Sequence, residues 1–109
     1  MADQFVYFIH ATESGRIKIG FALDPFTRLA ELQVGSPEVL ELIGLIPGGR
    51  ALESRIHVQL HSARLHGEWF ECTDHVTVVI GDLLGWGKPT PQQVESARKA
   101  AALRAELGV

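Results

Sequence analysis

The apolar positions of this chain change their spacing from one segment to the next, and the spacing predicts three strands. Residues 4–10 are apolar or aromatic on both alternating faces, which is typical of a central strand covered on two sides. Residues 16–19 alternate between charged and apolar side chains, and the polar turn before them predicts a hairpin. Gly20 is expected to end this second strand. Residues 39–46 are largely apolar and predict a third strand, because a proline and two glycines follow it.

Helical spacing predicts the segments between and after these strands. Asp24-Pro25 is a helix start, because an N-cap carboxylate is followed by proline at the first helical position. Further helices are expected at about residues 50–61 and from residue 73 or 74 to residue 84. In the first helix, the predicted buried arc consists of Phe26, Leu29, Ala30 and Leu32.

Together these elements predict an α+β fold with a small, mostly antiparallel three-stranded sheet flanked by helices. Residues 1–72 are expected to form the core, to which residues 67–70 add a short edge strand. Residues 73–109 are expected to form a helical extension packed on or beside the same domain. Its last helix, residues 91–107, serves either as a dimer interface or as a packed lid. The alanine-rich face that allows both consists of Val94, Ala97, Ala101 and Ala105.

The composition indicates a single globular domain. The chain has 109 residues, of which 46% are hydrophobic and 21% are charged. No apolar run approaches the roughly 18–20 residues that cross a bilayer, and the first residues lack the basic and apolar blocks of a signal peptide. The single cysteine, Cys72, excludes an internal disulfide. We therefore expect a soluble protein of the reducing cytoplasm.

The charge balance limits how the chain can bind nucleic acid. The formal net charge is −3, and residues 1–72 hold six Lys and Arg against nine Asp and Glu. DNA-binding proteins usually carry a surplus of cationic side chains that neutralises phosphates and releases counterions. Contact with DNA is therefore expected to be local, weak or assisted by a homodimer partner or a separate targeting protein.

Three consecutive predicted elements each carry a side chain suited to an anionic group. Tyr7 lies in the first strand, Lys18 in the second and Arg28 in the helix that follows. Taken singly, Tyr7 is best read as a core aromatic, and the two cations as ordinary solvated charges. Their joint order favours a second interpretation, in which a phenol, an amine and a guanidinium converge on one phosphate.

Several motifs of the sequence resemble those of a known family. Val6-Tyr7, the Ile-Lys-Ile-Gly of residues 17–20, Arg28 in the next helix and Glu53 in the following one resemble the GIY-YIG nuclease superfamily. The likeness is greatest to its short phage and bacterial branch, the meiotically up-regulated gene group with the T5-phage-type GIY-YIG domain. That branch also has an Asp-Pro-x-x-Arg-Leu helix, a Gly-Ser-Pro turn and a closing Gly-Glu-Trp-Phe. These motifs are present here at residues 24–29, 35–37 and 67–70.

The resemblance implies a metal-dependent endonuclease that hydrolyses phosphodiester bonds in DNA. Tyr7 is then the general base or the residue that orients the attacking water, and Arg28 binds the scissile phosphate. Glu53 is expected to hold one Mg²⁺ or Mn²⁺ ion, because hard cations prefer carboxylate oxygens. Lys18 is expected to contact phosphate or act on a proton. His57, one turn beyond Glu53, is expected to assist proton transfer or hold a phosphate.

The sequence departs from the superfamily pattern at three positions. Lys18 stands in place of the tyrosine of the second motif, and Phe5 in place of the glycine of the first. Many members also use a late asparagine, and this chain contains no Asn. Glu68, Trp69 or Thr73 can replace that residue structurally, but none is its chemical equivalent. Trp69 and Phe70 are expected to be core or rim aromatics, with stacking on a base as the alternative.

Two alternative functions therefore stay open. One is a GIY-YIG-shaped module that binds nucleic acid or a protein and does not cut, which the acidic charge and the missing asparagine favour. The other is a zinc site formed by Glu53, His57 and His61, because two histidines at positions i and i+4 suit Zn²⁺. Residue 58 is Val, so the His-Glu-x-x-His signature of metalloproteases is absent.

Overall fold

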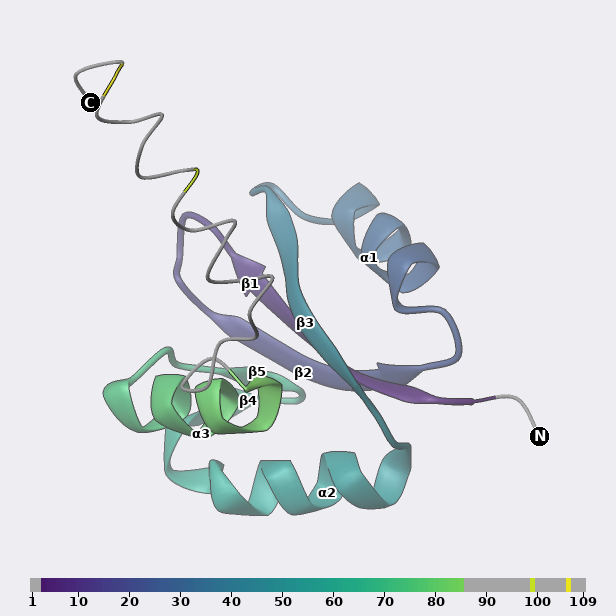
Figure 1. Cartoon of the computed structure of the whole chain (residues 1–109). Helices are drawn as coiled ribbons and strands as arrows, with labels where there is room; N and C mark the ends of the chain where they lie inside the picture. The colour runs from purple at the N-terminus through teal and green to yellow at the C-terminus, as the bar shows by residue number, and fades with distance from the viewer. Residues whose placement is uncertain (1–2, 86–98, 100–105, 107–109) are drawn as a thin grey trace.

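The structure, a computed structural model, describes residues 3–85 together with residues 99 and 106. Within this part the chain folds as a five-stranded antiparallel sheet with three α-helices, which confirms the α+β class (Figure 1). The predicted helix at residues 91–107 lies outside the described residues, apart from residues 99 and 106. Its alanine-rich face therefore stays a prediction.

The sheet is built around β1 (Phe5–Ala11), which pairs on one side with β2 (Ile17–Ala22) and on the other with β3 (Leu40–Pro47). Two short strands extend it, so that the spatial order is β3-β1-β2-β5-β4. The new strands are β4 (Arg64–His66) and β5 (Trp69–Phe70). The prediction of a central first strand is confirmed.

Three expectations about the sheet are wrong. The sheet has five strands rather than three, because all three residues of β4 are exposed and offer no apolar alternation to detect. The segment expected at the sheet edge, β5, instead lies between β2 and β4. The second strand also continues past Gly20 to Ala22, because the β1–β2 ladder extends to the pair Phe5 and Ala22.

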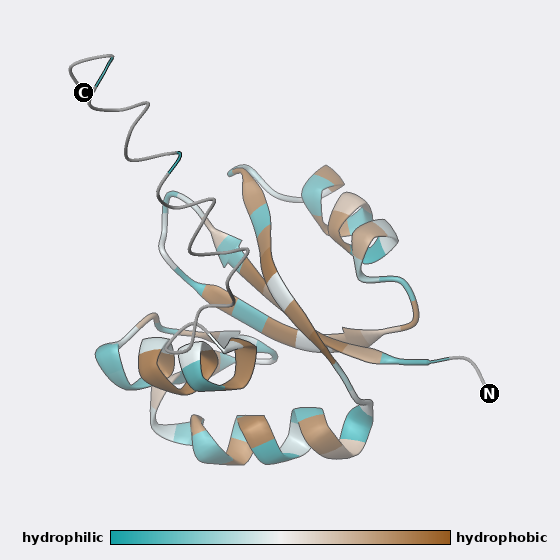
Figure 2. Ribbon diagram, viewed as in Figure 1, coloured by the Kyte–Doolittle hydropathy of each residue, from teal (hydrophilic) through white to brown (hydrophobic). Residues whose placement is uncertain are grey.

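The helices cover both faces of the sheet (Figure 1). Helix α1 (Pro25–Val34) covers one face, over the buried side chains of Tyr7, Ile9, Ala11 and Leu40. Helices α2 (Arg50–Gln59) and α3 (Asp74–Leu84) cover the other. The larger core lies beneath these two helices and contains Val6, Phe8, Ile17, Ile19, Ile56, Leu60, Phe70, Val76 and Ile80. Figure 2 shows the apolar residues concentrated along the central strands and alternating with polar ones on α2.

Helix α1 begins where the sequence predicted. The Asp24 side chain accepts hydrogen bonds from the backbone N–H groups of Phe26 (3.1 Å) and Thr27 (3.2 Å), with Pro25 at the first turn. The predicted buried arc is only half right, because Leu29 and Leu32 are half-buried but Phe26 is 67% exposed and Ala30 is also exposed. Pro25, not Phe26, shares the buried row with Leu29 and Leu32 at positions i, i+4 and i+7.

The other helices follow the predicted spans with small changes. Helix α2 ends at Gln59 and a 3₁₀ turn, His61–Ala63, leads into β4. Thr73 caps α3 by accepting from the N–H of Val76 (3.2 Å), and Gly85 ends the helix in the left-handed conformation, with φ of 75°. No helix within the described residues is both long and apolar enough to span a membrane.

Two nearby positions of α2 test which face of this helix is buried in the core. Ile56 is 2% exposed and lies in the larger core, whereas Val58 is 76% exposed. We expect Ile56→Ala to lower the free energy of unfolding by about 2–5 kcal/mol, because it removes buried methyl groups and leaves a cavity. Val58→Ala is the matched control and should change that free energy by less than about 0.5 kcal/mol. Urea unfolding followed by circular dichroism measures both, and equal losses would contradict the assignment of the buried face.

Candidate active site

Tyr7 is placed by strand pairing. It lies directly opposite Gly20 in the β1–β2 ladder, so both residues belong to the sheet face covered by α1. The missing side chain of Gly20 makes room for the Tyr7 ring. A Cβ at position 20 would overlap the Tyr7 hydroxyl and would lie 3.1 Å from the Glu68 carboxylate. Tyr7 is 1% exposed, and its hydroxyl and the Glu68 side chain therefore meet above Gly20.

Glu68 comes from the tight turn between β4 and β5, and two contacts hold it beside β2. Its backbone carbonyl accepts from the N–H of Ile19 (2.9 Å). Its carboxylate forms an ion pair with the Lys18 ammonium at 3.2 Å. Lys18 is itself only 8% exposed, and its ammonium lies 5.4 Å from the centre of the Trp69 ring. The ammonium is largely buried, whereas the Glu68 carboxylate stays about one-third exposed, so solvent screens the Lys18–Glu68 pair only in part.

Arg28 approaches the same corner from α1. Interaction with the Tyr7 hydroxyl is the main reason that the pKa of Arg28 is raised, which shows that the two groups are close. The Arg28 guanidinium also forms an ion pair with Glu31 at 3.2 Å, and its side chain remains 43% exposed. The guanidinium therefore has access to solvent.

Helix α2 supplies Glu53 and His57 from the other side of the β2 edge. One ligand atom each of Glu53, His57 and Glu68 lie within 4.8 Å of one another. The second carboxylate oxygen of Glu53 is buried and has no hydrogen-bond partner within the described residues. Buried polar atoms are normally paired, so this oxygen indicates a missing partner. Two carboxylates and an unpaired oxygen suit a hard divalent cation.

His57 is occupied by a structural contact. Its Nε2 atom lies 2.8 Å from the carbonyl oxygen of Ile19, and because a carbonyl can only accept, Nε2 carries the proton. Its ring also packs edge-on against Phe70, with the ring centres 4.9 Å apart. His57 therefore ties α2 to β2. While this bond persists, Nε2 is unable to bind a metal.

Burial and like charge perturb the acidic groups of the site. Desolvation, followed by repulsion from Glu68, raises the pKa of Glu53 to about 7. Burial also raises the pKa of Tyr7, and the negative charge of Glu68 adds to this effect, whereas Arg28 opposes it. Tyr7 is therefore a neutral phenol at pH 7, and Glu53 titrates close to neutrality. Such shifts cluster at functional sites.

Among the predicted residues, the structure brings Arg28 and Glu53 near enough to Tyr7, at one corner of the sheet, for both to shift the pKa of Tyr7, in opposite directions. Lys18 and His57 are also at this corner, but each is engaged by a protein partner. His61 is exposed and is not part of the acidic group, so the zinc set with His61 is not assembled. Glu68 is the residue whose role the sequence did not reveal. It was recognised in the Gly-Glu-Trp-Phe motif, but its nearness to Glu53 depends on the turn that carries it.

The protein is thus a small α+β domain, and the acidic and cationic side chains around β2 form a candidate site for a cation and a phosphate. The family described as the T5orf172 domain matches residues 4–86, which is most of the chain. The chain therefore belongs to the T5orf172 domain family, a phage-type domain associated with nuclease-related families. No curated protein and no solved structure shows significant similarity to it.

The contact between Tyr7 and Gly20 gives a prediction for a glycine that is not in a turn. In Gly20→Ala the new methyl group must displace the Tyr7 ring, and we expect the free energy of unfolding to fall by about 1–3 kcal/mol through overpacking. Gly35→Ala is the matched control, because a Cβ at position 35 meets nothing within 4 Å and φ is −93° there. Urea unfolding of both variants is the measurement. Equal stability of the two would show that Tyr7 does not lie against Gly20.

The raised pKa of Glu53 gives a prediction about pH. In the folded state the pKa of the Glu53 carboxyl is about 7, above its ordinary value of 4.5, so the folded protein binds more protons than the unfolded chain between these two values. The free energy of unfolding of the metal-free protein should therefore fall as the pH rises from 5 to 8, by on the order of 1–3 kcal/mol from this group.

Unfolding in urea at pH 5, 6, 7 and 8 measures this dependence. Glu53→Gln should remove much of the decrease, whereas Glu41→Gln, an exposed glutamate on β3, should keep it. An unchanged slope in Glu53→Gln would mean that Glu53 is not held in this environment.

Proposed function

We propose that this protein is a metal-dependent DNA endonuclease of the GIY-YIG type, which hydrolyses phosphodiester bonds with Mg²⁺ or Mn²⁺. The observation that carries the proposal is the buried, unpartnered oxygen of Glu53 close to Glu68, at the same corner as Tyr7 and Arg28. A binding module has no need of two partly buried carboxylates that repel each other. Membership of the T5orf172 domain family supports a nuclease-related role.

Glu53 and Glu68 are the residues that would hold the cation. A hard divalent ion bound there would offset negative charge on the phosphate and on the leaving oxygen. Glu53 must be ionised to serve as a ligand, and its pKa of about 7 allows this at neutral pH. Lys18 keeps Glu68 in place through the 3.2 Å ion pair and so positions the second carboxylate.

Tyr7 and Arg28 would act on the water and on the phosphate. The raised pKa keeps Tyr7 protonated at neutral pH, which favours orienting the attacking water through the hydroxyl oxygen over action as a free phenolate base. The Arg28 guanidinium is exposed enough to reach a phosphate, and its fork of N–H donors suits two phosphate oxygens. It would exchange Glu31 for the phosphate on binding.

The second candidate function is a module that binds nucleic acid or a protein without cutting. It is favoured by one observation, namely that Lys18 and Arg28 are each already paired with a glutamate. Together with the net charge of −3, these pairs leave little free positive charge for DNA. A homodimer partner or a targeting protein would supply the missing cationic surface for either function. The single cysteine supports action in the reducing cytoplasm.

Nicking of supercoiled plasmid tests the endonuclease. We expect cutting with Mg²⁺ or Mn²⁺ and none in EDTA, and losses of about 100-fold or more in Tyr7→Phe, Arg28→Ala and Glu53→Gln. Arg55→Ala and Glu41→Gln are the matched controls, because both residues are exposed and lie outside the site. They should retain wild-type rates.

The same assay separates the alternatives. Equal cutting by the wild type and by all the site variants would identify a contaminating nuclease. A salt-dependent gel shift without any cutting, unchanged in Glu53→Gln, would favour the binding module.

A further inference from the structure

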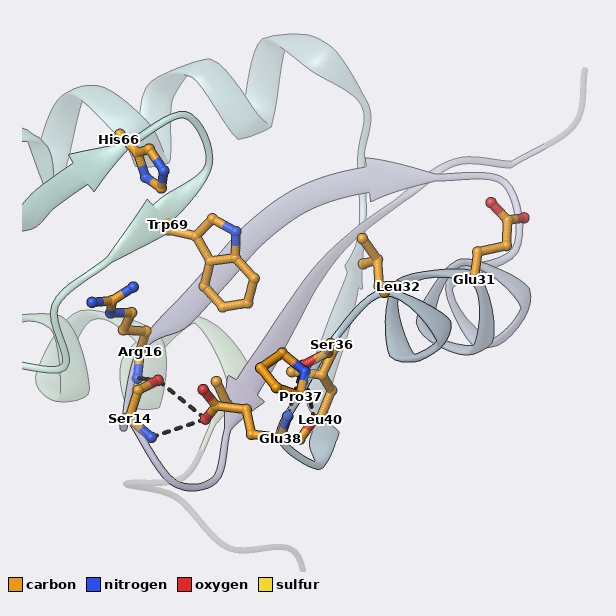
Figure 3. A pocket seen from close by; sticks show the side chains of 12 residues that line it. Ser14, Arg16, Glu31, Leu32, Ser36, Pro37, Glu38, Leu40, His66 and Trp69 are labelled. Atoms are coloured by element: carbon orange, nitrogen blue, oxygen red, sulfur yellow. Dashed lines mark hydrogen bonds between the residues drawn. The ribbon is translucent and has the colours of Figure 1, made fainter.

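A pocket of about 480 Å³ lies beside the candidate active site on the sheet face covered by α1. It is bounded by the β1–β2 turn, the end of α1, the loop that leads into β3, and the β4–β5 hairpin. Figure 3 shows the Trp69 indole projecting into the space between β5 and α1. None of the roles assigned above to Tyr7, Arg28 or Glu53 uses this pocket.

The walls of the pocket suit a flat, apolar-faced ligand. Trp69 provides an aromatic ring on one side, and Leu32, Pro37 and Leu40 provide apolar surface on the side of α1 and its following loop (Figure 3). The volume falls within the roughly 300–1,000 Å³ that small-ligand sites span. An indole face opposite aliphatic groups is the arrangement on which a nucleobase stacks.

Hydrogen bonds to Glu38 fix two of the loops that line the pocket. One carboxylate oxygen accepts from the backbone N–H groups of Glu13 (3.0 Å) and Ser14 (2.9 Å) and from the Ser14 hydroxyl (3.1 Å). The Glu38 carbonyl accepts from Gln33 (2.9 Å) and Ser36 (2.8 Å). The β1–β2 turn and the loop before β3 are therefore joined through one residue. The pocket is preformed rather than assembled by a ligand.

The charges in the pocket favour a base over a phosphate. Glu31 and Glu38 both line it, and the hydrogen bonds from Ser14 and Glu13 lower the pKa of Glu38, so that its carboxylate is ionised. A phosphate inside the pocket would be repelled by these two carboxylates. The second oxygen of Glu38 has no protein donor within the described residues, so it can accept from the amino or imino group of a base. Arg16 and His66, at the pocket lining, are available to the flanking backbone phosphates.

The pocket is continuous with the candidate active site through two shared residues. Trp69 lines the pocket and also lies against the Lys18 ammonium, 5.4 Å from the ring centre. Glu31 lines the pocket and also pairs with Arg28 at 3.2 Å. A phosphate bound at Arg28 would therefore lie near the pocket, and a neighbouring nucleotide of the same strand would be close to it.

We propose that this pocket holds a nucleobase unstacked from the DNA strand, next to the phosphate that is cut, with the base stacked on Trp69. The assignment to a base beside the cut bond rests on the proposed function. The recognition of a single unstacked base does not, because it depends on the pocket alone. The substrate class that follows is DNA with an unpaired or easily unpaired nucleotide, such as a single strand, a bulge or a mismatch.

Binding in EDTA tests the pocket without cleavage. The chain has two tryptophans, and Trp86→Phe leaves Trp69 as the sole indole. In that background, a single-stranded oligonucleotide should quench the Trp69 fluorescence and saturate, whereas an oligonucleotide of the same length made only of abasic sites should bind roughly 10-fold or more weakly. The abasic strand keeps every phosphate, so the difference reports the base.

Variants of Trp69 test whether the preference for a strand with bases depends on this side chain. Fluorescence polarisation with a labelled oligonucleotide should show that Trp69→Ala binds the normal and the abasic strands equally, and that Trp69→Phe restores part of the preference for bases. Phe26→Ala is the matched control, because Phe26 is an aromatic residue 67% exposed and outside the pocket. It should keep the wild-type preference.

Three outcomes would overturn the proposal. They are equal wild-type affinity for the normal and abasic strands, polarisation-detected binding with no change in Trp69 fluorescence, and tighter binding of free deoxynucleoside monophosphates than of the oligonucleotide. The last would assign the pocket to a mononucleotide instead of a strand. If plasmid cutting fails while the preference for bases persists, the endonuclease proposal fails and the base pocket stands.

Discussion

The arrangement of the candidate site depends on the edge of β2 that faces away from β1, which is only partly paired with another strand. Strand β5 pairs only with Ile17 and Lys18, so the rest of this edge has no neighbouring strand. Ile19 lies at the boundary. Its N–H donates to Glu68 and its carbonyl accepts from His57, both outside the β1–β2 ladder. Unpaired backbone groups at a sheet edge need partners, and here those partners come from the two segments that carry the acidic residues.

This use of the backbone explains how a chain of 109 residues can assemble a polar site within a small core. The His57–Ile19 bond and the packing of His57 on Phe70 fix one end of α2 against the sheet. One turn earlier on the same helix, Glu53 is thereby held beside Glu68. Burial of Glu53, followed by repulsion from the Glu68 carboxylate, raises the pKa of Glu53. The fold tolerates this arrangement because Lys18 neutralises Glu68 from the sheet side.

The two faces of the sheet differ in what they contain. The face under α2 and α3 contains the larger apolar core and provides most of the stability. The face under α1 is less completely covered, because a single helix lies on it and turns Phe26 and Ala30 to solvent. The open part of that face contains the pocket, and Trp69 separates the pocket from the Lys18–Glu68 pair. Under the proposals made above, this incomplete cover would let a nucleic acid strand reach both.

The sequence by itself determined the order and class of the elements, because caps, glycines and apolar spacing act locally. Asp24 and Thr73 begin their helices by bonds within the first turn, and Ile17 and Ile19 face the core because side chains alternate along a strand. It also indicated Tyr7 and Arg28 through their order in consecutive elements, and Glu53 through the motifs shared with a known family. The tertiary structure alone decided strand β4 and the place of β5 inside the sheet, the nearness of Glu68 to Glu53, and the engagement of His57 by Ile19. These features depend on contacts between residues far apart in the chain, and no local pattern of side chains records such contacts.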